Sequence, residues 1–157
     1  MSTDKTALYR LLNQQALALI DGETDLIANM ANLSALLFNQ LPDLNWAGFY
    51  IMRAGELVLG PFQGQVACVR IAVGKGVCGT AVATGQVQLV KDVHEFPGHI
   101  ACDAASNSEI VLPLRHKGEI IAVLDIDSPL LARFDLDDQA GLEQLIKLFE
   151  QHLAVTL

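Results

Sequence analysis

Residues 109–127, EIVLPLRHKGEIIAVLDID, decide the fold. Two apolar runs of strand length, 110–116 and 119–127, flank Lys117-Gly118, which is the pattern of a β-hairpin with a two-residue turn. A hairpin that turns there brings Glu109 close to Asp127. Asp125 lies two residues before Asp127, so both side chains point to the same face of the sheet. The sequence therefore predicts that three carboxyl groups meet on one face of an antiparallel pair of strands.

Short runs of apolar and β-branched residues precede the hairpin and predict further strands. A turn at Arg53-Ala54-Gly55 joins the first two of them. The predicted strands are 46–52, 56–62, 69–73 and 87–90, with a short helix at 77–84. A long segment, 91–108, then leads into the hairpin. A loop of that length in a compact domain is usually functional or disordered.

Helical periodicity marks both ends of the chain. Thr3 or Asp4 can cap a first helix that ends at Asp21-Gly22, and a second helix ends before Pro42. Asp135 can cap a C-terminal helix, with an acidic residue three positions on. The expected buried faces are Leu8, Leu11, Leu12, Ala16 and Leu19 in the first helix, Leu26, Met30, Leu33 and Leu37 in the second, and Leu142, Leu145, Ile146, Phe149 and Leu153 in the last. This order predicts an α+β fold with a mostly antiparallel central sheet and the N- and C-terminal helices packed on one side.

The composition is that expected of a single domain over residues 1–157. The chain is 52% apolar and 18% charged, and no apolar run reaches the ~20 residues that span a bilayer. The N-terminus has no secretory signal pattern, so we expect a cytoplasmic protein with no membrane partner. The net charge is −8 and the basic residues are scattered, which argues against nucleic acid as a partner.

The glycine-rich stretch GKGVCG at residues 74–79 has the spacing of a dinucleotide-binding motif. The helix predicted after it is too short for the crossover that such a site needs. We interpret the stretch as a tight turn in which glycine allows a positive φ or a close backbone approach. Cys78 then lies near the start of a helix, where the helix dipole favours a thiolate. A small buried filler is at least as good an interpretation of Cys78.

The three cysteines are Cys68, Cys78 and Cys102. An odd number in a chain expected to be intracellular argues against a structural disulfide framework. The thiols can be buried fillers, metal ligands, or one nucleophile with partners. Cys78 and Cys102 would form a zinc set with His94 and His99, but the usual closely spaced pair of cysteines is missing. We therefore expect no metal site and no cofactor.

The predicted cluster of Glu109, Asp125 and Asp127, called the acid cluster below, suggests a chemical role. Like charges at close range disfavour full ionisation, so one carboxyl can stay protonated and act as an acid. An exposed acidic end of a strand is the plain alternative. Trp46 and Tyr50 lie on a predicted strand, where each can be a buried strand aromatic or the wall of a pocket.

Three longer stretches resemble one known family. They are ACVRIAVGKGVCGTAV (67–82), VHEFPGHIACDAASNSEIVLPL (93–114) and VLDIDSP (123–129). Together they resemble the free methionine-(R)-sulfoxide reductases, a GAF-domain family, and the similarity extends from about Ala16 to about Phe149. Ordinary signalling GAF domains share the fold but not this set of three cysteines.

The resemblance implies a GAF fold and the reduction of free methionine (R)-sulfoxide to methionine. It implies Cys102 as the nucleophile, Cys68 as the resolving cysteine and Cys78 as a third cysteine of less settled role. The acid cluster is implied as part of the site, with Trp46 and Tyr50 lining the pocket. The implied cycle passes through a sulfenic acid and an intramolecular disulfide, which thioredoxin reduces.

Two other classes of function stay open. The first is a GAF module that binds a cyclic nucleotide or another small molecule without chemistry, although the predicted acid cluster would repel a phosphate. The second is a zinc or redox-sensor protein. A homodimer also stays open, because small GAF proteins often dimerise through their terminal helices.

Overall fold

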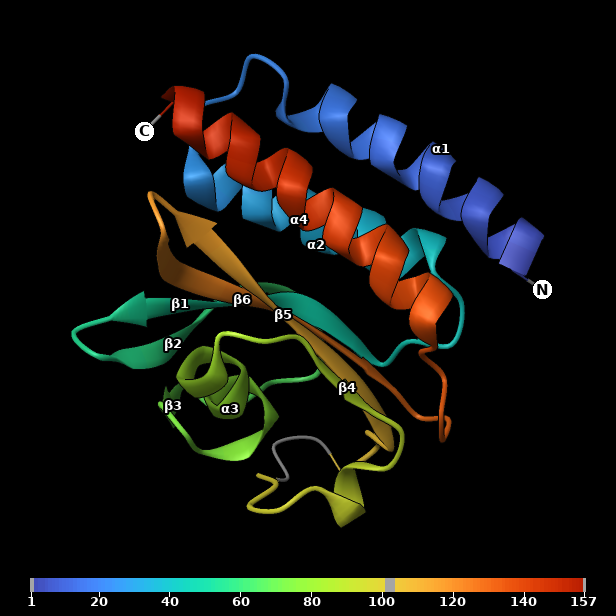
Figure 1. The fold of residues 1–157 in the computed structure, drawn as a ribbon, viewed down its shortest axis with the longest axis vertical. Helices are drawn as coiled ribbons and strands as arrows, with labels where there is room; N and C mark the ends of the chain where they lie inside the picture. The colour runs from blue at the N-terminus through green and yellow to red at the C-terminus, as the bar shows by residue number, and fades with distance from the viewer. Residues whose placement is uncertain (1, 101–103, 157) are drawn as a thin grey trace.

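The centre of the molecule is an antiparallel sheet with the strand order β3-β2-β1-β6-β5-β4. The structure is a computed structural model that describes residues 2–100 and 104–156 (Figure 1). The strands are β1 Trp46–Arg53, β2 Glu56–Gly64, β3 Arg70–Ala72, β4 Gln88–Val90, β5 Ser108–His116 and β6 Glu119–Ser128. The helices are α1 Ser2–Ile20, α2 Leu26–Gln40, α3 Gly76–Thr84, the short 3₁₀ helix η1 Val93–Glu95, and α4 Leu136–Thr156. The predicted α+β class and the order of the elements are confirmed.

The β5–β6 hairpin turns where the sequence predicts it. Lys117 and Gly118 both have positive φ, at 53° and 80°, which suits the tight turn of a two-residue hairpin. Glu109 lies opposite Asp127, and Asp125 lies opposite Val111. The predicted register, and with it the placement of the three carboxyl groups on one face, is confirmed.

Each strand of the hairpin sends alternate side chains to two different cores. Ile110 and Leu112 of β5 and Leu124 of β6 belong to a large apolar core beneath the helices. Val111 and Val123 belong to a smaller core on the opposite face, together with Trp46. Glu109, Asp125 and Asp127 share the alternation of this second set. The sheet is therefore covered on both faces, and the carboxyl groups are buried at the end of the smaller core.

Helices cover the two faces unequally (Figure 1). α2 and α4 pack on one face of the sheet and α1 lies over them, whereas α3 packs on the other face. Asp25 caps α2 by accepting a hydrogen bond from the Ala28 N–H, at 2.8 Å. Asp135 and Asp138 form the predicted capping box at the start of α4, each side chain accepting from the backbone N–H of the other.

The predicted buried face of α1 is wrong in part. Leu11 and Leu19 are exposed, at 52% and 40%. The buried stripe runs instead through Tyr9, Leu12, Ala16 and Ile20. Tyr9 fixes this orientation, because its hydroxyl donates to buried Asp138 Oδ1 at 2.7 Å and its ring lies against Gly141. This polar contact with α4 thus determines which face of α1 is buried, and that face differs from the one that the spacing of the leucines predicts.

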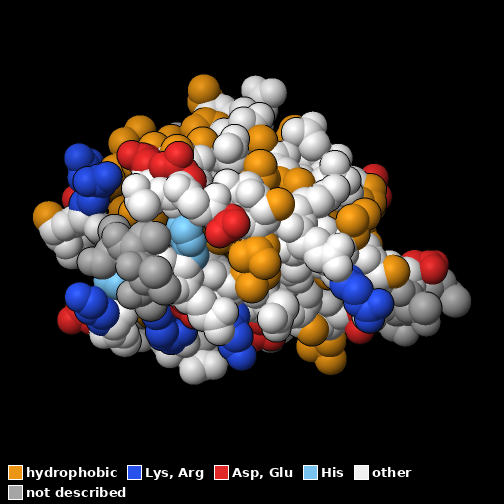
Figure 2. Space-filling view, turned by 90° about the horizontal axis from the view of Figure 1, so that it is seen from above, with side chains coloured by type: hydrophobic (Ala, Val, Ile, Leu, Met, Phe, Trp, Pro, Cys, Tyr) orange, Lys and Arg blue, Asp and Glu red, His pale blue; other side chains and the backbone are white. Residues whose placement is uncertain are grey.

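The outer surface mixes side-chain types. Apolar and charged side chains are interspersed on the face shown in Figure 2, and the Lys and Arg side chains there form no continuous stripe. In the described part of the chain, none of the helices combines the length and the hydropathy that crossing a membrane requires.

Candidate active site

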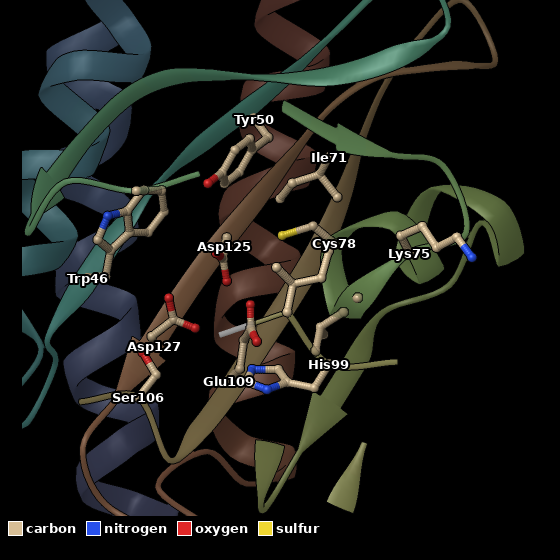
Figure 3. A pocket seen from close by; sticks show the side chains of 14 residues that line it. Trp46, Tyr50, Ile71, Lys75, Cys78, His99, Ser106, Glu109, Asp125 and Asp127 are labelled. Atoms are coloured by element: carbon tan, nitrogen blue, oxygen red, sulfur yellow. The ribbon is translucent and has the colours of Figure 1, made fainter. Parts of the chain in front are cut away.

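A pocket lies between the α3 face of the sheet and the segment that follows η1 (Figure 3). Its floor comes from β1, β5 and β6, one side from α3 and the turn before it, and another side from the long loop after β4. The lining residues are Trp46, Tyr50, Ala67, Ile71, Lys75, Gly76, Val77, Cys78, His99, Ile100, Ser106, Glu109, Asp125 and Asp127. All three members of the acid cluster, both predicted aromatic residues and Cys78 are therefore brought together.

The acid cluster is almost completely withdrawn from solvent. Glu109, Asp125 and Asp127 are 7%, 5% and 8% exposed, so the interpretation as an exposed strand end is wrong. Burial raises the pKa of Glu109 well above its ordinary value, and the negative charges of Asp125 and Asp127 raise it further. Burial also raises the pKa of Asp125, although hydrogen bonds to that carboxyl oppose the shift. The cluster therefore favours the protonated form of Glu109.

One oxygen atom of the acid cluster lacks a hydrogen-bond donor. Asp125 Oδ1 is buried and has no hydrogen-bond partner. A buried carboxylate oxygen without a donor is costly unless a ligand supplies one. This oxygen is therefore a suitable acceptor for a cationic or hydroxyl group of a bound molecule.

Cys78 lies at the inner end of this cluster, on the first turn of α3. Its sulfur and one oxygen each of Glu109 and Asp125 lie within 4.8 Å of one another. The thiol is 4% exposed, and Cys78 is a free cysteine. Burial raises its pKa well above the ordinary value, and the neighbouring carboxylates raise it further. Burial and like charge thus oppose the thiolate that the helix dipole would favour, and they favour the interpretation of Cys78 as a buried, neutral thiol.

The aromatic wall is both buried and part of the pocket, so both interpretations of Trp46 and Tyr50 hold. The two rings stack with centroids 5.8 Å apart, and Phe62 stacks on the other side of Trp46 at 5.0 Å. The Trp46 Nε1–H donates to the Gln65 carbonyl at 3.2 Å. The Tyr50 hydroxyl donates to the Cys68 carbonyl at 2.9 Å. These bonds fix both rings to the segment that carries Cys68.

The glycine-rich turn places α3 close to the sheet. Gly74 and Gly76 have positive φ, at 87° and 62°. A Cβ atom on Gly79 would come within 2.4 Å of the Ala72 carbonyl oxygen. Both predicted uses of glycine are thus confirmed, and together they hold the start of α3 against the pocket.

The remaining residues singled out in the sequence are two cysteines and two histidines. Cys68 is half-buried and disulfide-bonded, whereas Cys102 lies outside the described residues. His99 lines the pocket, and desolvation together with the charge of His94 lowers its pKa. His94 is exposed and pairs with Asp92 at 2.9 Å. Within residues 2–100 and 104–156, the one group of three side chains close enough to share a metal ion is Cys78, Glu109 and Asp125, which contains neither histidine of the considered zinc set.

Several lining residues belong to no chemical motif in the sequence. Ile71 and Val77 are ordinary core residues by type, and Lys75 sits in the glycine-rich turn. Ser106 is buried and accepts a hydrogen bond from Asn45 Nδ2 at 3.0 Å. The unusual length of the loop at 91–108 was the available signal for Ser106, because long loops in compact domains are often functional.

Comparison with known proteins agrees with this architecture. A family model described as "GAF domain" matches residues 28–154. The free methionine-R-sulfoxide reductase of Escherichia coli (strain K12) is 60% identical over 153 residues, covering 98% of this chain and 93% of that protein.

Two solved structures are also similar. The free methionine-R-sulfoxide reductase from Neisseria meningitidis, in complex with its substrate, is 45% identical with a TM-score of 0.93, covering 97% of this chain and 92% of that one. The fRMsr of Staphylococcus aureus, in complex with substrate, is 53% identical with a TM-score of 0.90, covering 93% and 95%. The chain belongs to the GAF-domain family of free methionine-R-sulfoxide reductases.

Proposed function

We propose that this chain reduces free L-methionine (R)-sulfoxide to L-methionine. The observation that carries the proposal is the buried acid cluster facing Trp46 and Tyr50 in one pocket. A sulfoxide oxygen leaves sulfur readily only after protonation, which a carboxyl group held neutral can supply. The similarity to reductases that carry this name supports the same reaction here.

The acid cluster divides into two roles in this proposal. Glu109, whose pKa is raised well above its ordinary value by burial and by its neighbours, is the general acid for the sulfoxide oxygen. Asp125 and Asp127 accept hydrogen bonds from the substrate ammonium. The unpartnered Oδ1 of Asp125 supports this role. Trp46 and Tyr50 enclose the S-methyl group, for which an aromatic wall is a suitable surface.

The redox chemistry uses two of the three thiols. Cys102 attacks the substrate sulfur as a thiolate, the oxygen passes to the cysteine sulfur, and methionine leaves while Cys102 becomes a sulfenic acid. The Cys68 thiol then condenses with the sulfenic acid, which forms a disulfide and releases water. A dithiol protein, thioredoxin, reduces the disulfide by exchange. The disulfide-bonded state of Cys68 supports its role as the resolving cysteine.

The substrate is the free amino acid in this proposal, since the pocket buries groups suited to an ammonium ion. A peptide-bound methionine sulfoxide lacks that charge and leaves the carboxylates of the cluster unpaired, at a cost in binding. We propose that residues 1–157 act as one GAF domain, in the reducing environment of the cytoplasm where thioredoxin is available.

The test supplies the separate R and S diastereomers of free methionine sulfoxide, with dithiothreitol as reductant, and measures methionine. We expect methionine from the R diastereomer, little from the S diastereomer, and little from the N-acetylated R compound. Absence of methionine from every compound would favour a binding module. Equal rates on the free and N-acetylated compounds would contradict an ammonium site made by the acid cluster.

A further inference from the structure

We propose that Cys78 is a positioning residue: its thiol donates a hydrogen bond to Asp125, helps to keep the cluster's proton on Glu109, and takes no part in thiol–disulfide exchange. This inference rests on the proposed function, because it concerns the acid that protonates the substrate. It assigns a role to the buried thiol that the reaction described above does not use.

The surroundings of Cys78 disfavour a redox role. Exchange needs a thiolate and access for an attacking or attacked sulfur. The thiol is 4% exposed and points toward the carboxylates of Asp125 and Glu109 (Figure 3). A thiolate formed there would place a further negative charge beside carboxyl groups that already disfavour one another's ionisation. A neutral S–H group, in contrast, is a donor placed beside acceptors.

The position of the thiol is also fixed by the backbone. The Gly79 N–H donates to the Lys75 carbonyl at 3.0 Å, and the Gly74 N–H donates back to the Gly79 carbonyl at 2.8 Å. The first turn of α3 is therefore tied to the glycine-rich turn before it. Gly79 also packs so closely on Ala72 that α3 has no room to move toward β3. These contacts limit how far the Cys78 sulfur can move.

The titratable groups that face Cys78 determine which protonation states its hydrogen bond can affect. β6 contributes Asp125 and Asp127, β5 contributes Glu109, and β1 contributes the Tyr50 hydroxyl. Among the described residues, the other charged or titratable groups that line the pocket are Lys75, on the turn before α3, and His99, on the long loop. The hydrogen bond between Cys78 and Asp125 favours the ionised form of the aspartate. It therefore opposes transfer of the shared proton from Glu109 to Asp125.

This arrangement predicts the direction of a change in pH dependence. The productive state has a proton on Glu109 and an ionised Asp125. Loss of the S–H donor makes Asp125 easier to protonate, so the doubly protonated cluster persists to higher pH. The acidic limb of the single-turnover pH–rate profile should then move upward by about half to one pH unit. Glu109 and Asp125 interact and titrate together, so the acidic limb reports an apparent pKa of the pair and not that of either residue.

The test compares Cys78→Ala, Cys78→Ser and Val77→Ala. Serine keeps a hydroxyl donor at the same place, whereas alanine removes it. Val77 lies next to Cys78, is buried in the same pocket and has no donor, so its truncation controls for lost packing. Each variant is pre-reduced, and the single-turnover rate is measured between pH 5 and pH 9. Recycling is followed separately with thioredoxin.

We expect the acidic limb to shift upward in Cys78→Ala, to return toward the wild type in Cys78→Ser, and to stay in place in Val77→Ala even if its rate falls. All three should recycle with thioredoxin. The proposal is overturned if Cys78→Ala keeps the wild-type profile, if Val77→Ala shifts it equally, or if Cys78→Ser forms methionine once and cannot be recycled. A wild-type protein that forms no methionine would instead refute the proposed function.

Discussion

Replacement of Glu109 by glutamine should nearly abolish turnover without disturbing the fold. The amide has almost the same shape and keeps a donor toward Asp125, but it cannot transfer a proton to the sulfoxide oxygen. Loss of a general acid typically costs 10²–10⁴-fold in rate, or about 3–5 kcal/mol of barrier. Asp125 and Asp127 cannot take over the role if they remain ionised and hold the ammonium. The assay is the single-turnover rate of methionine formation at saturating substrate.

The same substitution should stabilise the protein at neutral pH. The pKa of Glu109 in the folded protein lies well above 4.5, its ordinary value. Between pH 4.5 and the raised pKa, the folded protein keeps a proton that the unfolded chain has lost, so the wild type loses stability as pH rises through this window. Each unit of elevation corresponds to about 1.4 kcal/mol. Glutamine carries no such proton, so Glu109→Gln avoids the loss.

Thermal unfolding of both proteins at pH 4 and pH 8 measures this effect. The Tm advantage of Glu109→Gln should be small at pH 4 and larger at pH 8. A variant that keeps more than one-tenth of the wild-type rate would refute the assignment of the acid. An advantage that is equal at the two pH values would refute the buried, protonated state of Glu109.

Three further predictions test other contacts. Asp125→Asn should raise KM for the free sulfoxide more than it lowers kcat, because it removes a charge that holds the ammonium; steady-state kinetics would show the reverse if Asp125 were the acid. Gly79→Ala should lower stability by about 1–3 kcal/mol in denaturant unfolding, since its Cβ would collide with the Ala72 carbonyl; an unchanged midpoint would show that α3 can move. Tyr9→Phe should cost about 1.5–3 kcal/mol by removing the donor to buried Asp138 while leaving kcat within twofold; a large loss of kcat would reveal a link between α1 and the pocket.

The hairpin was predictable because its signals are local. A two-residue turn, alternating side chains and two aspartates at a spacing of two together determine which carboxyls meet. Glu109 opposite Asp127 follows from counting residues outward from Lys117-Gly118. The capping box at Asp135 and Asp138 is local in the same way.

Features that depend on tertiary packing were not predictable in this way. The face that α1 buries depends on Tyr9 reaching Asp138 on α4, 129 residues further along the chain. The state of the Cys78 thiol depends on its burial and on the carboxyl groups that β5 and β6 bring close to it, and both effects raise its pKa. His99 and Ser106 belong to the long loop between β4 and β5 and come to the pocket only in the folded protein. The contacts of Tyr9 and Cys78 leave no pattern in neighbouring residues, and only its length marks the loop that holds His99 and Ser106.

The most direct test of the central claim is the yield of methionine per chain in the absence of reductant. Fully pre-reduced wild type, Cys68→Ser and Cys102→Ser are each mixed with excess free methionine (R)-sulfoxide, and the methionine is quantified. Wild type and Cys68→Ser should each form about one methionine per chain, but Cys68→Ser should then recycle poorly with thioredoxin, and Cys102→Ser should form none. A full yield from Cys102→Ser would contradict the account, as would an absence of methionine from the wild type.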